Sequence, residues 1–421
     1  MARASRRPET GPRDELSRVG LALAGGGPLG AIYEIGALCA LQDCLQGLDL
    51  TRLGGYVGVS AGGFLAAGLA NGLTPRQMCA AFIEDDGLRA DHITPASFMR
   101  PAWAEFARRG AAVPGLLLQT LWHAARGRES LLASSERLAR ALPTGLFDPA
   151  PIEAQLRRVL DQPGRYNDFG ALRRSTGRRL VLVATDLDSG AAAPFGLPGW
   201  DAVPISQAAA ASAALPGLFT PVAVGRRWYV DGALKKTLHA SVLLDMDLNL
   251  VLCLNPLVPF DASHSEHRRV PGSDDTPIPR LVDGGLPVVM SQTFRSLIHS
   301  RLELGLKGYE RSHPGTDLVL LEPDHRDPTM FLANTFGYRQ RRLLAEHAYQ
   351  RTRADLRARR RPLAATLARH GITLNAARLD DARRHLIVPG PRPATRAARA
   401  LRRLDRVLDD LAAALPAPSL P

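Results

Sequence analysis

The sequence lacks the features that would place the protein across a membrane, in the secretory pathway or on nucleic acid. No apolar run approaches the roughly 20 residues that a membrane-spanning helix needs. Residues 1–15 are polar and basic without an apolar core, which argues against a secretory signal peptide. The sequence contains no recognisable nucleic-acid-binding motif, and its basic stretches are not interleaved with aromatic residues. We therefore expect a cytoplasmic protein with no nucleic-acid partner.

Cysteine is scarce, with four residues in a chain of 421. All four fall within apolar patterns without metal-ligand spacing: Cys39, Cys44, Cys79 and Cys253. This pattern predicts buried free thiols in a reducing compartment, and we expect neither a metal nor another cofactor. The length allows a large buried core, and a hydrophobic content of 45% is ordinary for a globular protein. Internal repeats are not evident.

Apolar runs alternate with helical stretches along most of the chain. The runs cover residues 19–24, 55–59, 180–186, 249–254 and 317–321. This alternation predicts an α/β protein with a mainly parallel central sheet covered by helices. Residues 90–145 interrupt this alternation, and we predict that they form a helical insertion. The insertion either caps a substrate pocket or supplies a pair of helices that completes the core.

Ser60 lies where a short apolar strand turns sharply into a helix. Gly58 and Gly62 flank it in a G-x-S-x-G pattern, which is typical of a nucleophile elbow because the tight turn leaves no room for a Cβ. The helix expected over residues 61–70 points its N-terminus at the serine, which favours developing negative charge. Taken alone, the pentapeptide fits a plain glycine-rich turn equally well, so the surrounding motifs decide.

A glycine-rich loop follows the first predicted strand, residues 18–24, and leads into a helix. Its glycines are Gly25, Gly26, Gly27 and Gly30. Backbone N–H groups in such a loop are accessible to an anion. The spacing matches a dinucleotide fingerprint, but the acid that this fingerprint needs at the end of the second strand is missing, since Asp49 precedes that strand. We favour an oxyanion hole beside the serine.

Asp231 ends another short apolar strand and is followed by Gly232. A carboxylate in this position can hydrogen-bond a serine hydroxyl and take its proton directly. An Asp-Gly pair is also a common β-turn, and Asp283-Gly284 shows the same dipeptide elsewhere in the chain. The pair therefore gains meaning only in combination with the two upstream motifs.

Together these motifs resemble the patatin-like phospholipase family in its bacterial form. The resemblance spans residues 18 to 260 and includes three further stretches: Ser212 to Pro221, Gly145 to Asp148 and Val183 to Gly190. It implies a three-layer α/β fold and hydrolysis of lipid carboxylic esters, such as phospholipids or acylglycerols, through an acyl-enzyme. It also implies that Ser60 is the nucleophile, Asp231 its proton acceptor, and the backbone of Gly25 to Gly27 the oxyanion hole.

One position departs from the family pattern. Many members carry Arg or Lys just before the last glycine of the loop, where this chain has Leu29. Loss of that cation keeps the backbone donors but removes electrostatic help with a phosphate head group. A weakly active lipid-binding or regulatory protein on the same scaffold is therefore one alternative. A Ser-His-Asp hydrolase is another, and His239 is the first histidine after Asp231.

Positive charge gathers near the C-terminus. The chain has a net charge of +12, but residues 339–406 alone contain 19 Arg and 5 acidic residues. We divide the chain into a flexible leader (1–17), a catalytic domain (18–338) and a basic helical appendage (339–421). In the last predicted helix the apolar positions are Leu401, Leu404, Leu408, Leu411 and Leu415. Such a helix can contact an anionic membrane, pack on its own domain or form a dimer seam. The oligomeric state stays open.

Overall fold

The computed structural model describes residues 16–84, 98–125, 139–236, 238–264, 280–331 and 340–387, together with Leu401, Leu404 and Leu408. Contacts divide the chain into a first unit that ends at Leu386 and a second unit, Ile387–Pro421. All the helices and strands named below belong to the first unit.

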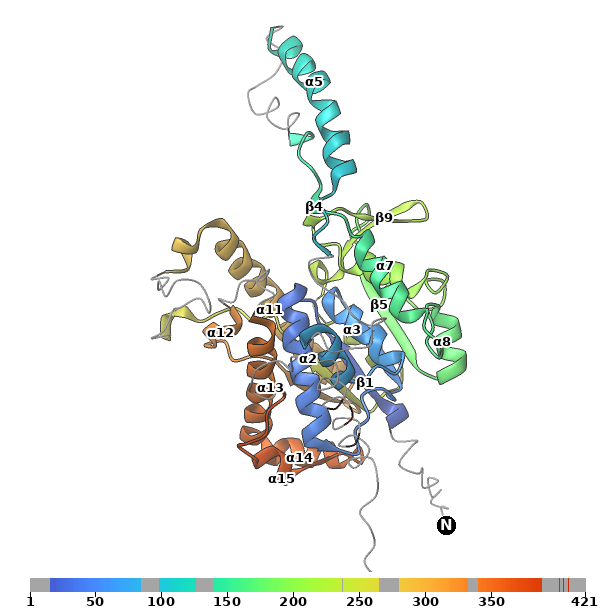
Figure 1. Cartoon of the computed structure of the whole chain (residues 1–421), viewed down its shortest axis with the longest axis vertical. Coiled ribbons are helices and arrows are strands. Elements are labelled where there is room, and N and C mark those ends of the chain that lie inside the picture. Colours follow the sequence, from blue (N-terminus) through green and yellow to red (C-terminus); the bar gives the residue numbers. More distant parts are fainter. Residues whose placement is uncertain are drawn as a thin grey trace, which may run out of the picture. The chain divides into compact units, whose positions relative to one another are not determined.

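Eight strands form the central sheet of the first unit (Figure 1). Their order is β11 (Asp317–Leu321), β10 (Leu250–Leu254), β1 (Val19–Leu23), β3 (Gly55–Gly58), β5 (Arg179–Asp186), β9 (Arg227–Asp231) and β8 (Val222–Val224), with β6 (Ala192–Phe195) paired to β5. Neighbouring strands from β11 to β5 are parallel, whereas β6, β8 and β9 are antiparallel. The five predicted apolar runs are the five parallel strands, so the expected α/β class is confirmed.

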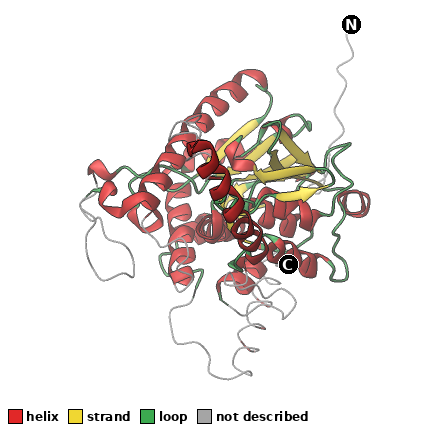
Figure 2. Ribbon diagram, turned by 90° about the horizontal axis from the view of Figure 1, so that it is seen from above, coloured by secondary structure: helices red, strands yellow, loops and turns green. Residues whose placement is uncertain are grey.

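Side chains alternate between the two faces of the parallel strands, and helices cover both faces (Figure 2). On one face, alanine and valine side chains pack with residues of α10 (Ser241–Leu244) and α11 (Gly285–Ser312). The other face meets α3 (Ala61–Ala70), where Gly63 lies against Leu182 of β5. Burial on both sides explains why these strands are apolar along most of their length.

The remaining elements complete the layers. The other helices are α2 (Gly27–Cys44), α4 (Pro75–Met78), α5 (Trp103–Ala125), α7 (Ala150–Leu160), α8 (Phe169–Thr176), α9 (Ile205–Ser212), α12 (Pro328–Phe331), α13 (Arg341–Ala358), α14 (Arg360–Ala368) and α15 (Ala376–Asp380). Two small sheets pair β2 (Leu45–Gln46) with β12 (Thr373–Leu374), and β4 (Gly145–Phe147) with β7 (Gly217–Phe219). The four cysteines are buried and unpaired, as expected.

Helix α2 is buried on nearly all sides, with thirteen of its 18 residues buried. A helix that is apolar all round has to be covered on every side. Helix α13 supplies one of these covers: a Cβ added at Gly36 would lie only 2.5 Å from the carbonyl oxygen of Ala345. The start of the basic C-terminal stretch is therefore part of the core.

Polar contacts fasten the rest of this stretch to the same unit. The hydroxyl of Tyr349 donates to Asp43 of α2 at 2.7 Å, and Arg384 donates to the same carboxylate at 3.0 Å. Burial works against the ionised form, but these hydrogen bonds hold the pKa of Asp43 below its ordinary value. Arg353 is 1% exposed and donates to the carbonyl oxygens of Arg378 and Asp381 at 2.7 Å.

The boundary expected at residue 339 therefore moves to Leu386. Thirteen of the 19 arginines precede that point, and several of them form ion pairs: Arg359 with Asp355, Arg360 with Asp380, and Arg369 with Asp317. In the second unit Leu401, Leu404 and Leu408 are exposed. Leu411 and Leu415 of the expected apolar stripe lie outside the described residues.

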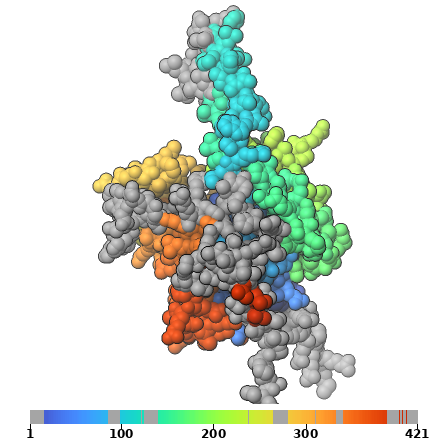
Figure 3. Space-filling view, viewed as in Figure 1, coloured from blue at the N-terminus to red at the C-terminus, as the bar shows by residue number. Residues whose placement is uncertain are grey.

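The expected insertion at 90–145 contains α5. The residues of α5 are cyan in the space-filling view of Figure 3. Three of the aromatic and leucine side chains of this helix are largely exposed, with Trp103 at 70%, Leu118 at 72% and Trp122 at 55%. Helix α5 therefore does not complete the core, which was one of the two alternatives. Within the described segments, no helix is both long enough and apolar enough to cross a bilayer.

Candidate active site

Ser60 occupies a strained turn between β3 and α3. Its backbone has φ 53° and ψ −124°, a left-handed conformation that residues other than glycine rarely adopt. Gly58 and Gly62 make this turn possible. A Cβ at Gly58 would lie 2.5 Å from the Cα of Gly63, and one at Gly62 would lie 2.4 Å from the carbonyl oxygen of Ala24. The predicted elbow is thus present, and its glycines are required by close backbone contacts.

Ser212 holds the elbow in place from α9. The backbone N–H of Ser60 donates to Ser212 Oγ at 2.9 Å, and the Ser212 hydroxyl donates to the Val183 carbonyl at 2.6 Å. Both bonds are buried, so each polar group is satisfied without water. The sequence motif contained Ser212, but its spacing gave no indication that this residue anchors the elbow.

The glycine-rich loop lies directly beside the serine because β1 and β3 are parallel neighbours, with Leu23 opposite Gly58. A Cβ at Gly25 would be 3.1 Å from Ser60 Cβ and 3.7 Å from Ser60 Oγ. Helix α2 begins at Gly27, which has φ +59°. The first N–H groups of a helix have no intrahelical acceptors, so they are available to an anion.

Gly30 differs from the other loop glycines. Its N–H donates to the Gly26 carbonyl at 2.9 Å and is therefore already bonded inside the helix. Its small size matters instead, because a Cβ there would approach Pro256 Cγ to 3.1 Å. Gly30 is one of the four residues expected to form an oxyanion hole, but its N–H is not free to bind an anion.

Asp231 ends β9 and is 2% exposed. One carboxylate oxygen accepts the backbone N–H of Ala233 at 2.8 Å, and the Ser60 side chain lies close enough to the carboxylate to stabilise its ionised form. Burial raises the pKa of Asp231 to about 6, and the interactions with Ser60 and Ala233 limit the rise. Gly232 is needed next to it, since a Cβ there would lie 2.1 Å from the Val183 carbonyl oxygen.

His239 lies near this site but does not complete a triad. Its Nε2 is 3.4 Å from the Gly232 carbonyl oxygen, and burial lowers the pKa of the imidazole to about 4. Among the described residues, no histidine is a hydrogen-bond partner of Ser60 or Asp231. The geometry therefore gives no support to the Ser-His-Asp alternative.

A cavity of about 390 Å³ opens over Ser60 and Asp231. Its walls are mostly apolar and include six phenylalanines: Phe64, Phe82, Phe98, Phe147, Phe219 and Phe294. Leu29 also lines it, at the position where the family often has a cation. Such a cavity suits an apolar chain that ends at a polar group next to the serine.

Arg295 is a cavity residue that sequence reasoning missed. It comes from α11, and its guanidinium donates to the Val258 carbonyl at 3.2 Å and lies over the Phe331 ring at 5.2 Å. Burial lowers its pKa to about 10, so it stays charged at neutral pH. It provides a positive charge on the cavity wall, where Leu29 provides none.

These features define an α/β protein with a serine elbow beside a glycine-rich loop and a buried carboxylate. The model of the patatin-like phospholipase family matches residues 21–244, more than half of the chain. The chain belongs to that family, as the resemblance of its motifs predicted. Family membership supports lipid hydrolase activity.

Several solved structures are similar to this chain. VipD from Legionella pneumophila shows 15% identity, covers 81% of this chain and 67% of its own, and has a TM-score of 0.38. ExoU from the type III secretion system of Pseudomonas aeruginosa, solved with SpcU, shows 19% identity at a TM-score of 0.33. A second ExoU structure shows 16% identity at a TM-score of 0.32. The chain spans about half the length of ExoU. No curated protein matches the chain in sequence.

Proposed function

We propose that the protein is a serine acyl hydrolase that cleaves lipid carboxylic esters through a dyad of Ser60 and Asp231. The observation that carries this proposal is the position of the Ser60 side chain beside the buried Asp231 carboxylate, whose ionised form it stabilises, with both residues at the wall of an apolar cavity. A serine hydroxyl needs a base close to it, and Asp231 can serve as that base without a histidine.

The proposed reaction has two balanced steps. Ser60 Oγ attacks the ester carbonyl as its proton passes to Asp231, and the oxyanion forms beside the N–H groups of Gly26 and Gly27. The C–O bond then breaks, and the alcohol leaves with the proton from Asp231. Water next attacks the acyl-enzyme, gives one proton to Asp231, and releases the fatty acid as Ser60 regains a proton. Preorganised donors stabilise the charge in both steps.

The substrate class follows from the cavity walls. Phenylalanine, leucine and isoleucine side chains surround the serine, so an acyl chain is a better match than a polar acyl group. Leu29 favours a neutral ester, whereas Arg295 favours an anionic head group. Phospholipids and acylglycerols both remain in the proposal.

Covalent labelling tests the proposal most directly. A fluorophosphonate probe reacts only with an activated serine, and we expect it to label the wild-type protein at Ser60 and to leave Ser60→Ala unlabelled. A panel of phospholipids, lysophospholipids and acylglycerols then identifies the ester. A protein that binds these lipids but is neither labelled nor active would instead favour the lipid-binding alternative.

The pH dependence of hydrolysis provides a second test. Asp231 must be ionised to accept the serine proton, and its pKa is raised to about 6 by burial. We therefore expect kcat/KM on a soluble ester to fall about tenfold per pH unit below pH 6 and to level off above it. An ordinary aspartate would place this limb about two pH units lower.

The matched control for this profile is His239→Asn. The pKa of His239 is lowered to about 4, so its imidazole does not titrate near pH 6. Asparagine also tolerates the φ of 46° at this position. The variant should keep the limb at about 6. A limb that disappears with His239, or one that lies near pH 4, would contradict the proposed role of Asp231.

We also propose that residues 387–421 contact an anionic membrane surface. This segment contains six Arg and three Asp, and the described leucines Leu401, Leu404 and Leu408 are exposed. Deleting 387–421 should preserve hydrolysis of a soluble short-chain ester and reduce binding to anionic vesicles. In the intact protein, vesicle binding should already weaken as salt rises, because exposed charges are screened beyond about 8 Å at physiological ionic strength.

A longer deletion is the control for this truncation. Removing 339–421 also removes α13 and uncovers α2, so we expect an insoluble protein. Vesicle binding that is unchanged after deletion of 387–421 would refute the membrane contact. A soluble, active product from the longer deletion would show that α13 is not needed for the core.

A further inference from the structure

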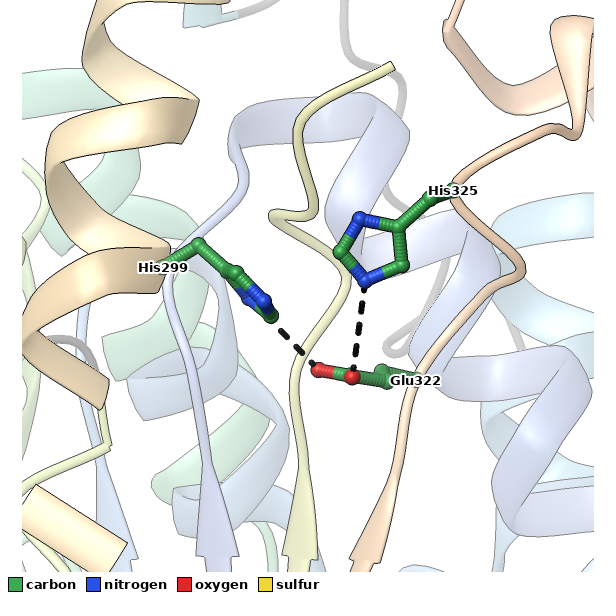
Figure 4. A group of neighbouring side chains, drawn as sticks. All are labelled: His299, Glu322 and His325. Carbon is green, nitrogen blue, oxygen red and sulfur yellow. Dashed lines mark ion pairs between the residues drawn. The ribbon is translucent and has the colours of Figure 1, made fainter. Parts of the chain in front are cut away.

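A group of three side chains lies apart from the proposed dyad, at the carboxyl edge of the central sheet. His299 comes from α11, Glu322 directly follows β11, and His325 lies three residues further on; the three side chains point toward one another (Figure 4). Their ligand atoms all lie within 4.8 Å of one another. Two imidazoles and a carboxylate are a donor set that zinc accepts.

The distances in this group are too long for direct hydrogen bonds. His299 Nδ1 lies 4.0 Å from Glu322 Oε2, and His325 Nε2 lies 3.8 Å from Glu322 Oε1. His299 Nδ1 is buried and has no hydrogen-bond partner. A buried nitrogen left in this way costs free energy, so these three groups do not satisfy one another.

An ion between the side chains would satisfy them. Nitrogen and oxygen ligands lie about 2.0–2.2 Å from zinc, which puts two ligands of a tetrahedral site about 3.4 Å apart. The ligand atoms of this group lie within 4.8 Å of one another, so each pair has to approach by about 1.4 Å or less to reach that separation. The side chain of His325 is 38% exposed, so it has room to move. Three protein ligands leave a fourth position for water.

The groups around the cluster orient its members as supporting residues do in metal sites. The other nitrogen of His299, Nε2, lies 3.2 Å from the carboxylate of Glu303, one helical turn away. This contact favours the tautomer in which Nδ1 carries the lone pair. The side-chain amide of Asn255 donates to Glu322 Oε2 at 3.3 Å, which fixes the carboxylate.

We propose that His299, Glu322 and His325 bind a divalent transition-metal ion of the zinc type, which fastens α11 to the carboxyl edge of the sheet. The proposed metal site is connected to the candidate active site through only a few residues. Asn255 precedes Pro256, and Pro256 is the residue that packs on the glycine-rich loop at Gly26 and Gly30. One turn before His299, Arg295 lines the cavity. The metal therefore supports two walls of the site without touching the reacting atoms.

Calorimetric titration of the full-length protein tests the site. The protein is stripped with a chelator, dialysed and titrated with Zn²⁺. We expect one equivalent to bind, with affinity reduced at least about 100-fold in Glu322→Gln and in His325→Ala. The matched control is His385→Ala. This histidine is 42% exposed and lies 3.0 Å from Glu346, outside the cluster, so its loss should not change the affinity.

A thermal melt tests the fastening. Zn²⁺ should raise the melting temperature of the wild type and of His385→Ala, but not that of Glu322→Gln, because only a bound ion stabilises the folded state. Circular dichroism shows whether each variant is folded. A wild type without stoichiometric binding, a Glu322→Gln variant that binds like the wild type, or binding without a rise in melting temperature would each overturn the proposal.

The metal site and the proposed hydrolysis can fail separately. Ser60 is not a ligand, so Ser60→Ala should bind Zn²⁺ as the wild type does. Metal binding in a protein that no fluorophosphonate labels would leave the site standing and refute the hydrolase. Labelling by the fluorophosphonate without metal binding would support the hydrolase and refute the metal site.

Discussion

Replacing Ser60 with alanine, or Asp231 with asparagine, is expected to lower the kcat of ester hydrolysis by about 10⁴-fold or more. Without Ser60 no acyl-enzyme forms, and without the Asp231 carboxylate nothing accepts the serine proton. Because the two residues act as a unit, the double variant should be no slower than the slower single variant. Initial rates on a soluble ester, measured on all three purified variants, check this expectation.

Folding has to be separated from chemistry in these variants. Asp231 has a pKa of about 6 in the folded protein, above the ordinary value near 4, so its ionisation at neutral pH opposes folding. Asparagine removes this cost, which is on the order of 3 kcal/mol, and keeps an acceptor for the Ala233 N–H. Asp231→Asn should therefore melt higher than the wild type at pH 7 and lose this advantage as the pH falls through 6 to 4.

Two outcomes would contradict the dyad. One is substantial turnover in Asp231→Asn together with an inactive His239→Asn, which would move the general base to the histidine. The other is a loss of activity in Asp231→Asn that accompanies a lower melting temperature, because the effect would then be structural. An inactive but stable variant is the expected result.

The parallel strands and the elbow were predictable because their signals are local. Each parallel strand is covered on both faces, so it reads as an unbroken apolar run in the sequence. Gly58 and Gly62 are required by atoms only a few residues away or on the adjacent strand β1, so the requirement leaves a short motif. The positions of Ser60 and the glycine-rich loop follow from that motif and from the pairing of β1 with β3, whereas Asp231 on β9 was recognised only in combination with the two upstream motifs.

The antiparallel strands at one edge of the sheet were harder to predict from the sequence. Strand β8 covers only Val222–Val224, and none of its three residues is buried. Strands this short and open carry no apolar run long enough to be recognised. The His299, Glu322 and His325 group was also hidden, because helix α11 and strand β11 bring together residues up to 26 positions apart without a repeated spacing.

The boundary expected at residue 339 was misplaced because the net charge of a stretch does not show which of its charges are paired inside the fold. Arg353 contributes to the +14 net charge of the basic stretch, yet it is buried and its guanidinium donates to backbone carbonyls near α15. Arg384 similarly binds Asp43 of α2. The sequence does not distinguish an arginine that is bonded inside the fold from one in solvent; only the contacts of the folded chain do.

Gly26→Ala is expected to reduce kcat by about 10²- to 10³-fold with little change in KM, the loss that follows removal of one oxyanion donor. The added Cβ would lie 2.8 Å from Gly30 Cα and 2.9 Å from Pro256 Cγ, so the loop has to shift. A shift of the backbone moves the N–H groups that face the oxyanion, whereas the apolar cavity that binds the acyl chain keeps its walls. Steady-state kinetics on a soluble ester measures both parameters.

Comparison with two other alanine variants separates donor geometry from general disturbance. Gly27 has open space around a new Cβ but a φ of +59°, so Gly27→Ala should lose activity through backbone strain of about 1–2 kcal/mol. Gly110 in α5 has neither a neighbour within 4 Å nor a positive φ, so Gly110→Ala should behave as the wild type. If Gly26→Ala keeps its kcat while it remains folded, the oxyanion hole does not lie in this loop, because a displaced donor cannot stabilise the tetrahedral intermediate as well as a preorganised one.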